Sequence, residues 1–389
     1  MQSWIRIAIA GSATLMVGMG IGRFSYTPLV PALIGEGSVT SFEAGYVGAG
    51  NLAGYLIGAL LALILGRSFG ETRTLKVSLW ISLACLVGSI FDFGFIWLAC
   101  WRFLIGVTVA VMMILTLSIV TRSAPGNFLG RATGIVFTGV GVGILFSGFF
   151  IPILLRAGVF EAWIGMALVG LAGVILGHWG WNAVSLEPKE KKLEEQGVEK
   201  KPGLTTPIIG LIASQTMFSI GLIPHTIFWV DYLVRGLGHN INFGGFHWVL
   251  FGIGAISGTY LWGRFADLVG FRAALVLVFS LLSIGILIPV TIIEAWALIF
   301  SSLVVGAQPG FSAIISGRTH QIVGAALMPV VWRWMMLTSG ILQAIGGYVY
   351  VFVFDYTGDY VLVFCIGGTA MALGAVVSFA FISKGKKYN

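Results

Sequence analysis

Long apolar runs, separated by short polar connections, occupy most of this 389-residue chain. The hydrocarbon core of a bilayer, about 30 Å thick, is crossed by roughly 20 helical residues, so each run is long enough to span a membrane. Helices are expected because a lipid-exposed strand edge would leave backbone polar groups unsatisfied. The runs predict an all-α integral membrane protein with twelve transmembrane helices, near residues 5–33, 43–65, 75–92, 96–120, 130–154, 161–182, 206–234, 244–265, 273–290, 295–317, 325–353 and 360–382.

Composition excludes a soluble globular protein. Apolar residues make up 58% of the chain and charged residues 10%, against about 45–50% and 25% in soluble domains. The first apolar run is too long for a signal peptide and contains Arg23, so we expect it to be retained as a span. The three cysteines lie singly in apolar runs, which predicts neither a disulfide framework nor a metal site: Cys85, Cys100 and Cys365.

The net charge of +7 reflects membrane topology, and we expect no nucleic acid partner, because the basic residues lie at the ends of apolar runs and form no patch. With both termini in the cytoplasm, the inner basic residues are Arg6, Arg67, Arg73, Lys76, Arg122, Arg131, five lysines within 187–202, Arg264, Arg272, Arg318, Lys384, Lys386 and Lys387. The outer connections carry acidic residues, with Arg156 and Arg235 as the basic exceptions. This positive-inside distribution predicts a multi-pass protein of the cytoplasmic (inner) membrane.

A charged segment in the middle of the chain divides the spans six plus six. Residues 187–202 (EPKEKKLEEQGVEKKP) contain five Lys and five Glu and have no apolar face, which is typical of a solvated tether. We predict an N-terminal bundle over 1–183, a cytoplasmic linker over 184–205 and a C-terminal bundle over 206–389. A shift of 200 positions superimposes five glycines of the first half on five of the second, as duplicated halves require: Gly45, Gly54, Gly58, Gly70 and Gly106 on Gly245, Gly254, Gly258, Gly270 and Gly306.

The connection after the eighth span has a spacing suited to a conformational latch. Gly263, Asp267, Gly270 and Arg272 form a GxxxDxxGxR pattern in which the carboxylate can pair with a neighbouring helix end or arginine in one state and release it in another. The pattern resembles the signature loop of the major facilitator superfamily of transporters. The corresponding first-half connection has Arg67 at the position of the aspartate.

Further motifs resemble the YbfB-like branch of that superfamily. The first span contains GIGRFSYTPLVP over 20–31 and the second contains Asn51 with GYLIG over 54–58. Similar motifs follow at RFLIG over 102–106, GVGVG over 139–143 and TSGILQAIG over 338–346. The resemblance covers nearly the whole chain and implies a transporter of two pseudo-symmetric six-helix bundles.

Three arginines lie within predicted spans. Each costs about 2.5–3.5 kcal/mol in the bilayer interior, so Arg23, Arg102 and Arg333 are expected to face a cavity or a partner. For each, the alternative is a structural pair or the capping of backbone carbonyls, an alternative that weighs most for Arg102. Carboxylates are scarce at depth, and a guanidinium binds carboxylate or phosphate groups in bidentate fashion, so the excess positive charge favours an anionic substrate.

Four other polar residues are candidates for contact with the substrate. Tyr26 shares a helical face with Arg23 in the first span. Asn51 and Gln343 either contact substrate or join helices through small-residue interfaces. His225 follows Pro224 and either carries the coupled proton or binds carbonyls that the proline frees.

These residues predict a secondary active transporter that moves a small, carboxylate-like organic anion by alternating access, coupled to protons. The chain has no nucleotide-binding loop, and we expect no cofactor, no metal and no enzymatic activity, because its five histidines are isolated. We expect a monomer in the lipid bilayer. Proton-coupled multidrug or cation efflux is the alternative, and a non-transporting receptor is the third hypothesis.

Overall fold

The computed structural model describes residues 3–125, 128–182, 184 and 203–381, and within these ranges every regular element is a helix. The first half of the chain contains α1 (Ser3–Leu15), η1 (Met16–Arg23), α2 (Tyr26–Gly35), α3 (Ser41–Phe69), α4 (Glu71–Gly88), α5 (Phe95–Ser123), α6 (Leu129–Leu154) and α7 (Val159–Trp181). The second half contains α8 (Thr206–Gly221), η3 (Pro224–Phe228), α9 (Trp229–Asp231), η4 (Tyr232–Gly236), α10 (Ile241–Val269), α11 (Phe271–Thr291), α12 (Ala295–Gly306), η5 (Gln308–Gly310), α13 (Phe311–Thr357) and α14 (Tyr360–Ala380).

These elements make twelve crossings, which confirms the predicted count. Helices η1, η3 and η4 are π-helical pieces inside the first and seventh crossings. The long helix α13 contains Gly324 with φ +71°, and this non-helical residue separates the tenth crossing from the eleventh. In the described chain ten segments are long and apolar enough to span a membrane, and α4 and α10 complete the set.

Local signals explain why several helices extend beyond the predicted apolar runs. A capping box begins α3, in which the Thr40 hydroxyl accepts from the Glu43 N–H and the Glu43 carboxylate accepts from the Thr40 N–H. The same helix continues through polar residues and ends at Gly70, whose φ of +85° is strained for any residue with a side chain. Apolar periodicity alone does not register such termini, so 43–65 becomes Ser41–Phe69 and 75–92 becomes Glu71–Gly88.

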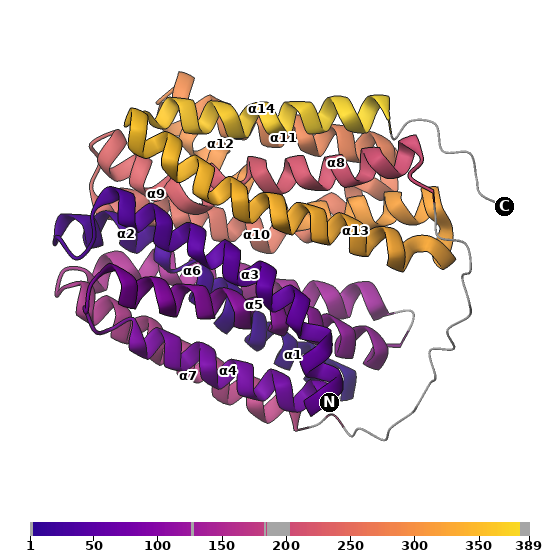
Figure 1. Ribbon diagram of the computed structural model, residues 1–389, viewed down its shortest axis with the longest axis horizontal. Helices are drawn as coiled ribbons and strands as arrows, with labels where there is room; N and C mark the ends of the chain where they lie inside the picture. The colour runs from indigo at the N-terminus through magenta and orange to yellow at the C-terminus, as the bar shows by residue number, and fades with distance from the viewer. Residues whose placement is uncertain (1–2, 126–127, 183, 185–202, 382–389) are drawn as a thin grey trace.

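The two halves of the chain lie side by side. In Figure 1, helices α1 to α7 fill the lower part of the molecule and α8 to α14 the upper part, with both chain ends on the right. We call the right-hand end, toward which the N and C labels lie, the linker side, and the opposite end the far side. The domain boundaries stay a prediction, and most of the predicted linker lies outside the described residues.

Glycines set the close helix contacts, and the contacts recur at a spacing of 200 residues. A Cβ atom on Gly54 would lie 2.0 Å from the carbonyl oxygen of Phe103, and one on Gly254 would lie 2.4 Å from that of Leu303. Likewise, a Cβ on Gly106 would lie 2.2 Å from the Asn51 carbonyl oxygen. Backbones approach this closely only where no side chain intervenes, so α3 packs on α5 as α10 packs on α12.

We expect Gly106→Ala to lower the free energy of unfolding by about 1–3 kcal/mol, because the added methyl group must displace the backbone of α3. Thermal unfolding of the purified protein in detergent measures the change. Gly50→Ala is the matched control, since a Cβ there meets no atom within 4 Å and alanine favours the helix. Equal stability of the two variants would contradict the packing argument.

Candidate functional site

A break in the first crossing positions Arg23. The π-helix η1 ends at Arg23, and Phe24 and Ser25 form a turn before α2 begins. Glycine is a weak helix former, and GMGIG over 18–22 allows this departure; Gly20 also packs directly on the backbone of Gly143 in α6. The break exposes backbone carbonyls inside the membrane, where they need a donor.

Arg102 supplies that donor from α5. Its guanidinium donates to the carbonyl oxygens of Gly22 and Arg23, the latter at 2.7 Å, and lies 4.8 Å from the centre of the Tyr26 ring. Only 1% of Arg102 is exposed. These contacts correspond to the carbonyl-capping alternative for Arg102, so its side chain is committed to the backbone of the first crossing.

Tyr26 and Asn51, both predicted as substrate contacts, are also committed to the protein. The Tyr26 hydroxyl donates to the Ala44 carbonyl oxygen at 2.9 Å, and the Asn51 amide donates to the Arg102 carbonyl oxygen at 2.9 Å. Both side chains are buried. In this conformation the pair joins helices, which is the interface alternative left open for Asn51.

Arg23 differs from Arg102 because its guanidinium has no committed partner. The side chain is partly exposed and lies over two rings, with its central carbon 5.4 Å from the Phe24 centroid and 5.6 Å from the Tyr55 centroid. Within the described chain it forms no hydrogen bond through its side chain and no ion pair. A cation held only by aromatic faces retains all five of its N–H donors for a ligand.

His225 is part of the packed second half. It is fully buried, its Nε2 lies 2.8 Å from the Ser301 hydroxyl oxygen, and its ring stacks on Trp229 at 4.5 Å. The substrate-contact and proton-carrier prediction placed a titratable group in an open cavity. The structure instead places a core histidine there, in the π-helical η3 and next to Ser301 of α12.

Gln343 and Arg333 both lie on α13, away from Arg23. The Gln343 amide donates to the Ser219 carbonyl oxygen at 3.3 Å and joins α13 to α8. Arg333 is exposed in the part of α13 that follows Gly324, and its predicted depth in the membrane stays a prediction. None of the described contacts brings either residue, or His225, to Arg23.

The two halves meet on the far side of Arg23. The Thr27 hydroxyl donates to the Thr226 carbonyl oxygen at 2.6 Å, and the Arg235 guanidinium donates to the Ser41 hydroxyl at 2.9 Å. Phe24, next to Arg23, lies with its ring centre 6.1 Å from that of Trp248. The protein is therefore closed between Arg23 and the far side.

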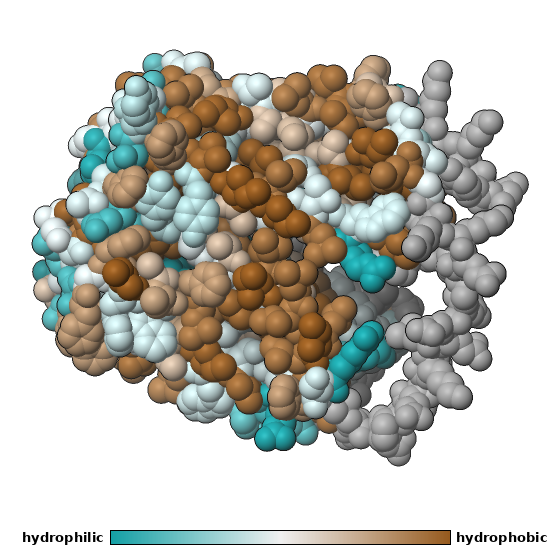
Figure 2. Space-filling model, viewed as in Figure 1, coloured by the Kyte–Doolittle hydropathy of each residue, from teal (hydrophilic) through white to brown (hydrophobic). Residues whose placement is uncertain are grey.

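Toward the linker side the halves separate. A Cβ on Gly141 or Gly252 would clash with the opposite half, whereas Gly134 and Gly263, about two and three turns nearer the linker side, have no atom within 4 Å of that position. Figure 2 shows a notch in the right-hand edge of the molecule, between the halves. The two halves thus form a cleft that opens to the linker side. Arg23 lies near the closed end of this cleft, next to the contacts that join the halves.

Asp231, which is not among the predicted site residues, lies where the two halves meet on the far side. Its carboxylate, 3% exposed, accepts from the Tyr360 hydroxyl at 2.5 Å and pairs with Arg235 at 3.3 Å. The four-residue spacing of Asp231 and Arg235 on one helix could have indicated this pair. Nothing in the sequence indicates the contacts with Tyr360 and Ser41, which come from α14 and α3.

The predicted latch residues form the expected tight turn but no latch in this conformation. Gly270, with φ +83°, joins α10 to α11, and Gly263 lies within the last two turns of α10. Asp267 is exposed and has no hydrogen bond or ion pair with a described side chain, and Arg272 lies 5.5 Å from the Phe379 ring centre. In the first half, a carboxylate outside the motif forms an ion pair at the linker side.

That carboxylate belongs to Glu71, at the start of α4. Its carboxylate pairs with Arg122 and accepts from the Ser118 hydroxyl at 3.1 Å. An acidic residue at a helix N-terminus interacts favourably with the helix dipole, and this position could have indicated it. Glu71 ties α4 to the linker-side end of α5.

Comparison with protein families decides the identity of this architecture. The family described as "Uncharacterised MFS-type transporter YbfB" matches residues 15–379. The chain belongs to this family. It is therefore a multi-pass membrane transporter of the major facilitator superfamily and not an enzyme, as the motifs predicted.

Solved structures of other transporters share the fold of this YbfB-family chain. A D-xylose-proton symporter aligns with a TM-score of 0.75 at 15% identity, covering 98% of this chain and 99% of that chain. The xylose transporter XylE from E. coli, in an inward open conformation, aligns with a TM-score of 0.75 at 14% identity, covering 100% and 98%. A mutant form of the nucleoside transporter NupG aligns with a TM-score of 0.74 at 13% identity, covering 97% and 100%. No curated protein sequence matches the chain.

We expect Arg102→Met to lower the free energy of unfolding by about 2–5 kcal/mol, because it leaves the carbonyls of Gly22 and Arg23 without their donor. Arg23→Met, the matched control, should cost less than about 1 kcal/mol, since that guanidinium has no hydrogen-bond partner in the described chain. Thermal unfolding and the yield of monodisperse protein measure both. Similar losses for the two variants would contradict the distinction between the arginines.

Proposed function

We propose that this transporter is a secondary carrier of a small organic anion across the cytoplasmic membrane, driven by protons and working by alternating access. The observation that supports an anion is Arg23, a guanidinium beneath the closed end of the cleft with no carboxylate partner in the described chain. A cation at this depth costs about 2.5–3.5 kcal/mol unless a partner compensates it. A carboxylate substrate would be that partner.

The ring contacts of Arg23 support the same substrate class. Tyr55 and Phe24 hold the guanidinium by their faces, and the Tyr55 hydroxyl is occupied by the Met113 sulfur at 3.1 Å. The guanidinium is thus held in place while its N–H groups remain available to a planar anion. The roles first predicted for Arg333, His225 and Gln343 are not part of this proposal.

For proton coupling, Asp231 replaces His225 as the proposed carrier. Arg235 binds Asp231 within its own half and Ser41 in the other half, so the charge on Asp231 holds the side chain that crosses the gate. Protonation would remove that charge and weaken the closure of the far side. The residue thereby links proton binding to the gate.

The orientation of the cycle follows from charge. The cleft opens to the linker side, where the basic residues of the inner connections gather, and the positive-inside rule assigns that side to the cytoplasm. We therefore assign an inward-open conformation, with both termini in the cytoplasm. Each half would rock about the contacts of α3 with α13 and of α6 with α10.

We expect Arg23→Gln to reduce anion uptake about 10- to 100-fold at low substrate concentration, the value of one charge-assisted pair, without loss of folded protein. The measurement is flux in liposomes under an imposed pH gradient, with a trapped pH dye and a panel of carboxylates, phosphonates, neutral sugars, nucleosides and cationic dyes. Arg156→Gln, in an outer connection, is the matched control.

Flux of cations alone would contradict the anion proposal and favour multidrug efflux. Flux of sugars or nucleosides that is indifferent to Arg23→Gln would contradict it as well. Anion flux that does not move protons would remove the coupling and leave the substrate class standing.

The gate predicts a second outcome. Ser41→Ala removes the hydroxyl that accepts from Arg235, so the far side should open more often, about 2- to 10-fold. A cysteine at buried Val30 reports this as faster labelling by a membrane-impermeant maleimide from outside cells, in a Cys100→Ser background. Thr357→Val is the control, because that hydroxyl bonds only to Val353 and Asp359 of its own half. Unchanged labelling in Ser41→Ala would contradict the gate.

A further inference from the structure

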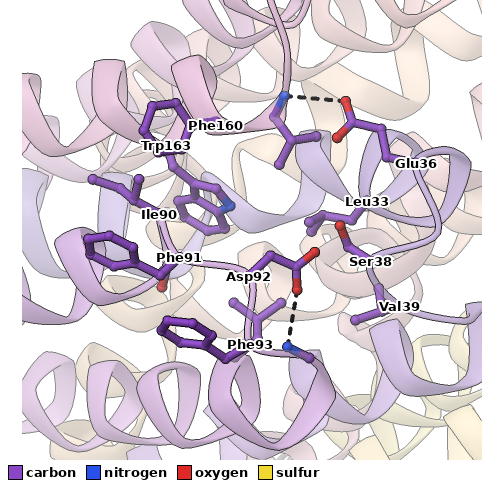
Figure 3. A pocket seen from close by; sticks show the side chains of 14 residues that line it. Leu33, Glu36, Ser38, Val39, Ile90, Phe91, Asp92, Phe93, Phe160 and Trp163 are labelled. Carbon is purple, nitrogen blue, oxygen red and sulfur yellow. Dashed lines mark hydrogen bonds between the residues drawn. The ribbon is translucent and has the colours of Figure 1, made fainter.

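A cavity of about 280 Å³ lies within the first half at its far-side end, apart from the cleft. Three segments line it: the connection from α2 to α3 with Glu36 and Ser38, the connection from α4 to α5 with Asp92 and Phe93, and the start of α7 with Trp163. Figure 3 shows these side chains around one space. Neither the transport mechanism nor the family motifs use any of them.

Two carboxylates give the cavity its charge. One oxygen of Glu36 accepts from the Val159 N–H at 3.3 Å, and one oxygen of Asp92 accepts from the Gly94 N–H at 3.1 Å. The second oxygen of each carboxylate has no partner in the described chain, and neither group forms an ion pair there. In Figure 3 the Asp92 carboxylate points toward Ser38. Two acids with free oxygens on one cavity favour a cation.

Trp163 provides an independent sign of a ligand. Only 1% of this side chain is exposed, yet its indole N–H donates to no described residue. Figure 3 shows the ring nitrogen directed into the space between Leu33 and Glu36. An indole N–H that reaches a cavity is available to donate, and a ligand oxygen in this cavity would accept from it.

Aromatic rings complete the lining. Phe91, Phe93 and Phe160 stand at the rim with 50%, 70% and 53% of their surface exposed. Aromatic faces attract ammonium groups and complement carboxylates in binding them. Exposed rings at this level also suit the interface between lipid headgroups and hydrocarbon.

We propose that this cavity binds an ammonium compound that also carries a hydrogen-bond acceptor, such as a hydroxyl or phosphoester oxygen. The ammonium group lies between Glu36 and Asp92, and the acceptor receives the Trp163 N–H. A free amino alcohol and the headgroup of phosphatidylethanolamine share this chemistry. Since Glu36 follows the helix that continues from Arg23, the ligand would hold the outer end of the first crossing against the start of α7.

The test uses the purified full-length protein in detergent and titration calorimetry with ethanolamine, glycerophosphoethanolamine and ethylamine. Ethanolamine and glycerophosphoethanolamine should bind at one site, and Asp92→Asn and Glu36→Gln should each weaken binding at least about tenfold. Asp355→Asn, an exposed acid at the far side of the other half, should leave it unchanged. Trp163→Phe keeps a ring and removes the N–H, so it should weaken binding of ethanolamine and leave that of ethylamine, which has no acceptor.

Nanodiscs distinguish the two sources. If the lipid headgroup is the occupant, protein in phosphatidylethanolamine discs no longer binds glycerophosphoethanolamine, whereas protein in phosphatidylglycerol discs does. If a free amino alcohol is the ligand, both preparations bind it. Absence of binding of every ammonium probe to the wild type in phosphatidylglycerol discs, or equal binding by Asp92→Asn and Glu36→Gln, would overturn the proposal.

Discussion

The need to satisfy backbone carbonyls inside a membrane governs this site. The first crossing changes from a π-helix to a turn and back to an α-helix within a few residues, and water is not available there to bind the freed groups. Arg102 does so from α5, and Tyr26 and Asn51 hold Arg102 in turn. Arg102 is therefore bound to the backbone, whereas the guanidinium of its neighbour Arg23 keeps its N–H groups free of hydrogen bonds in the described chain.

The contact between the two halves depends on glycines of α6 and α10. Gly141, Gly148, Gly245 and Gly252 bring α6 and α10 into backbone contact across the halves, and the contact stops before Gly134 and Gly263. Such surfaces carry few polar bonds, since lipid tails provide no hydrophobic force between helices and close packing must stabilise them. In the described chain, the hydrogen bonds between the halves on the far side, from Thr27, Arg235 and Trp248, are few and can exchange without unfolding either half.

Sequence predicted the fold well because its signals are local and repeated. Twelve apolar runs, the 200-residue spacing of glycines and the turn at Gly270 all survive in the structure. The site residues were harder to predict. A polar residue within an apolar span is noticeable in the sequence, but the sequence does not show which neighbours its side chain contacts. His225 turned into the core, and the depth of Arg333 depended on where a helix resumes after Gly324. The tie between Asp231 and Tyr360 joins residues 129 positions apart and leaves no local pattern.

Gly70 and Gly270 have a mechanical consequence. Each is the single residue between two crossings, α3 and α4 in one half and α10 and α11 in the other, with nearly equal φ angles of +85° and +83°. A connection of one residue has no slack. If one helix moved along its neighbour, the next crossing would have to move with it. A displacement at the interface between the halves is therefore transmitted to the peripheral helices. Short joints of this kind make each half move as one body, and they reserve flexibility for the broken crossings that line the path.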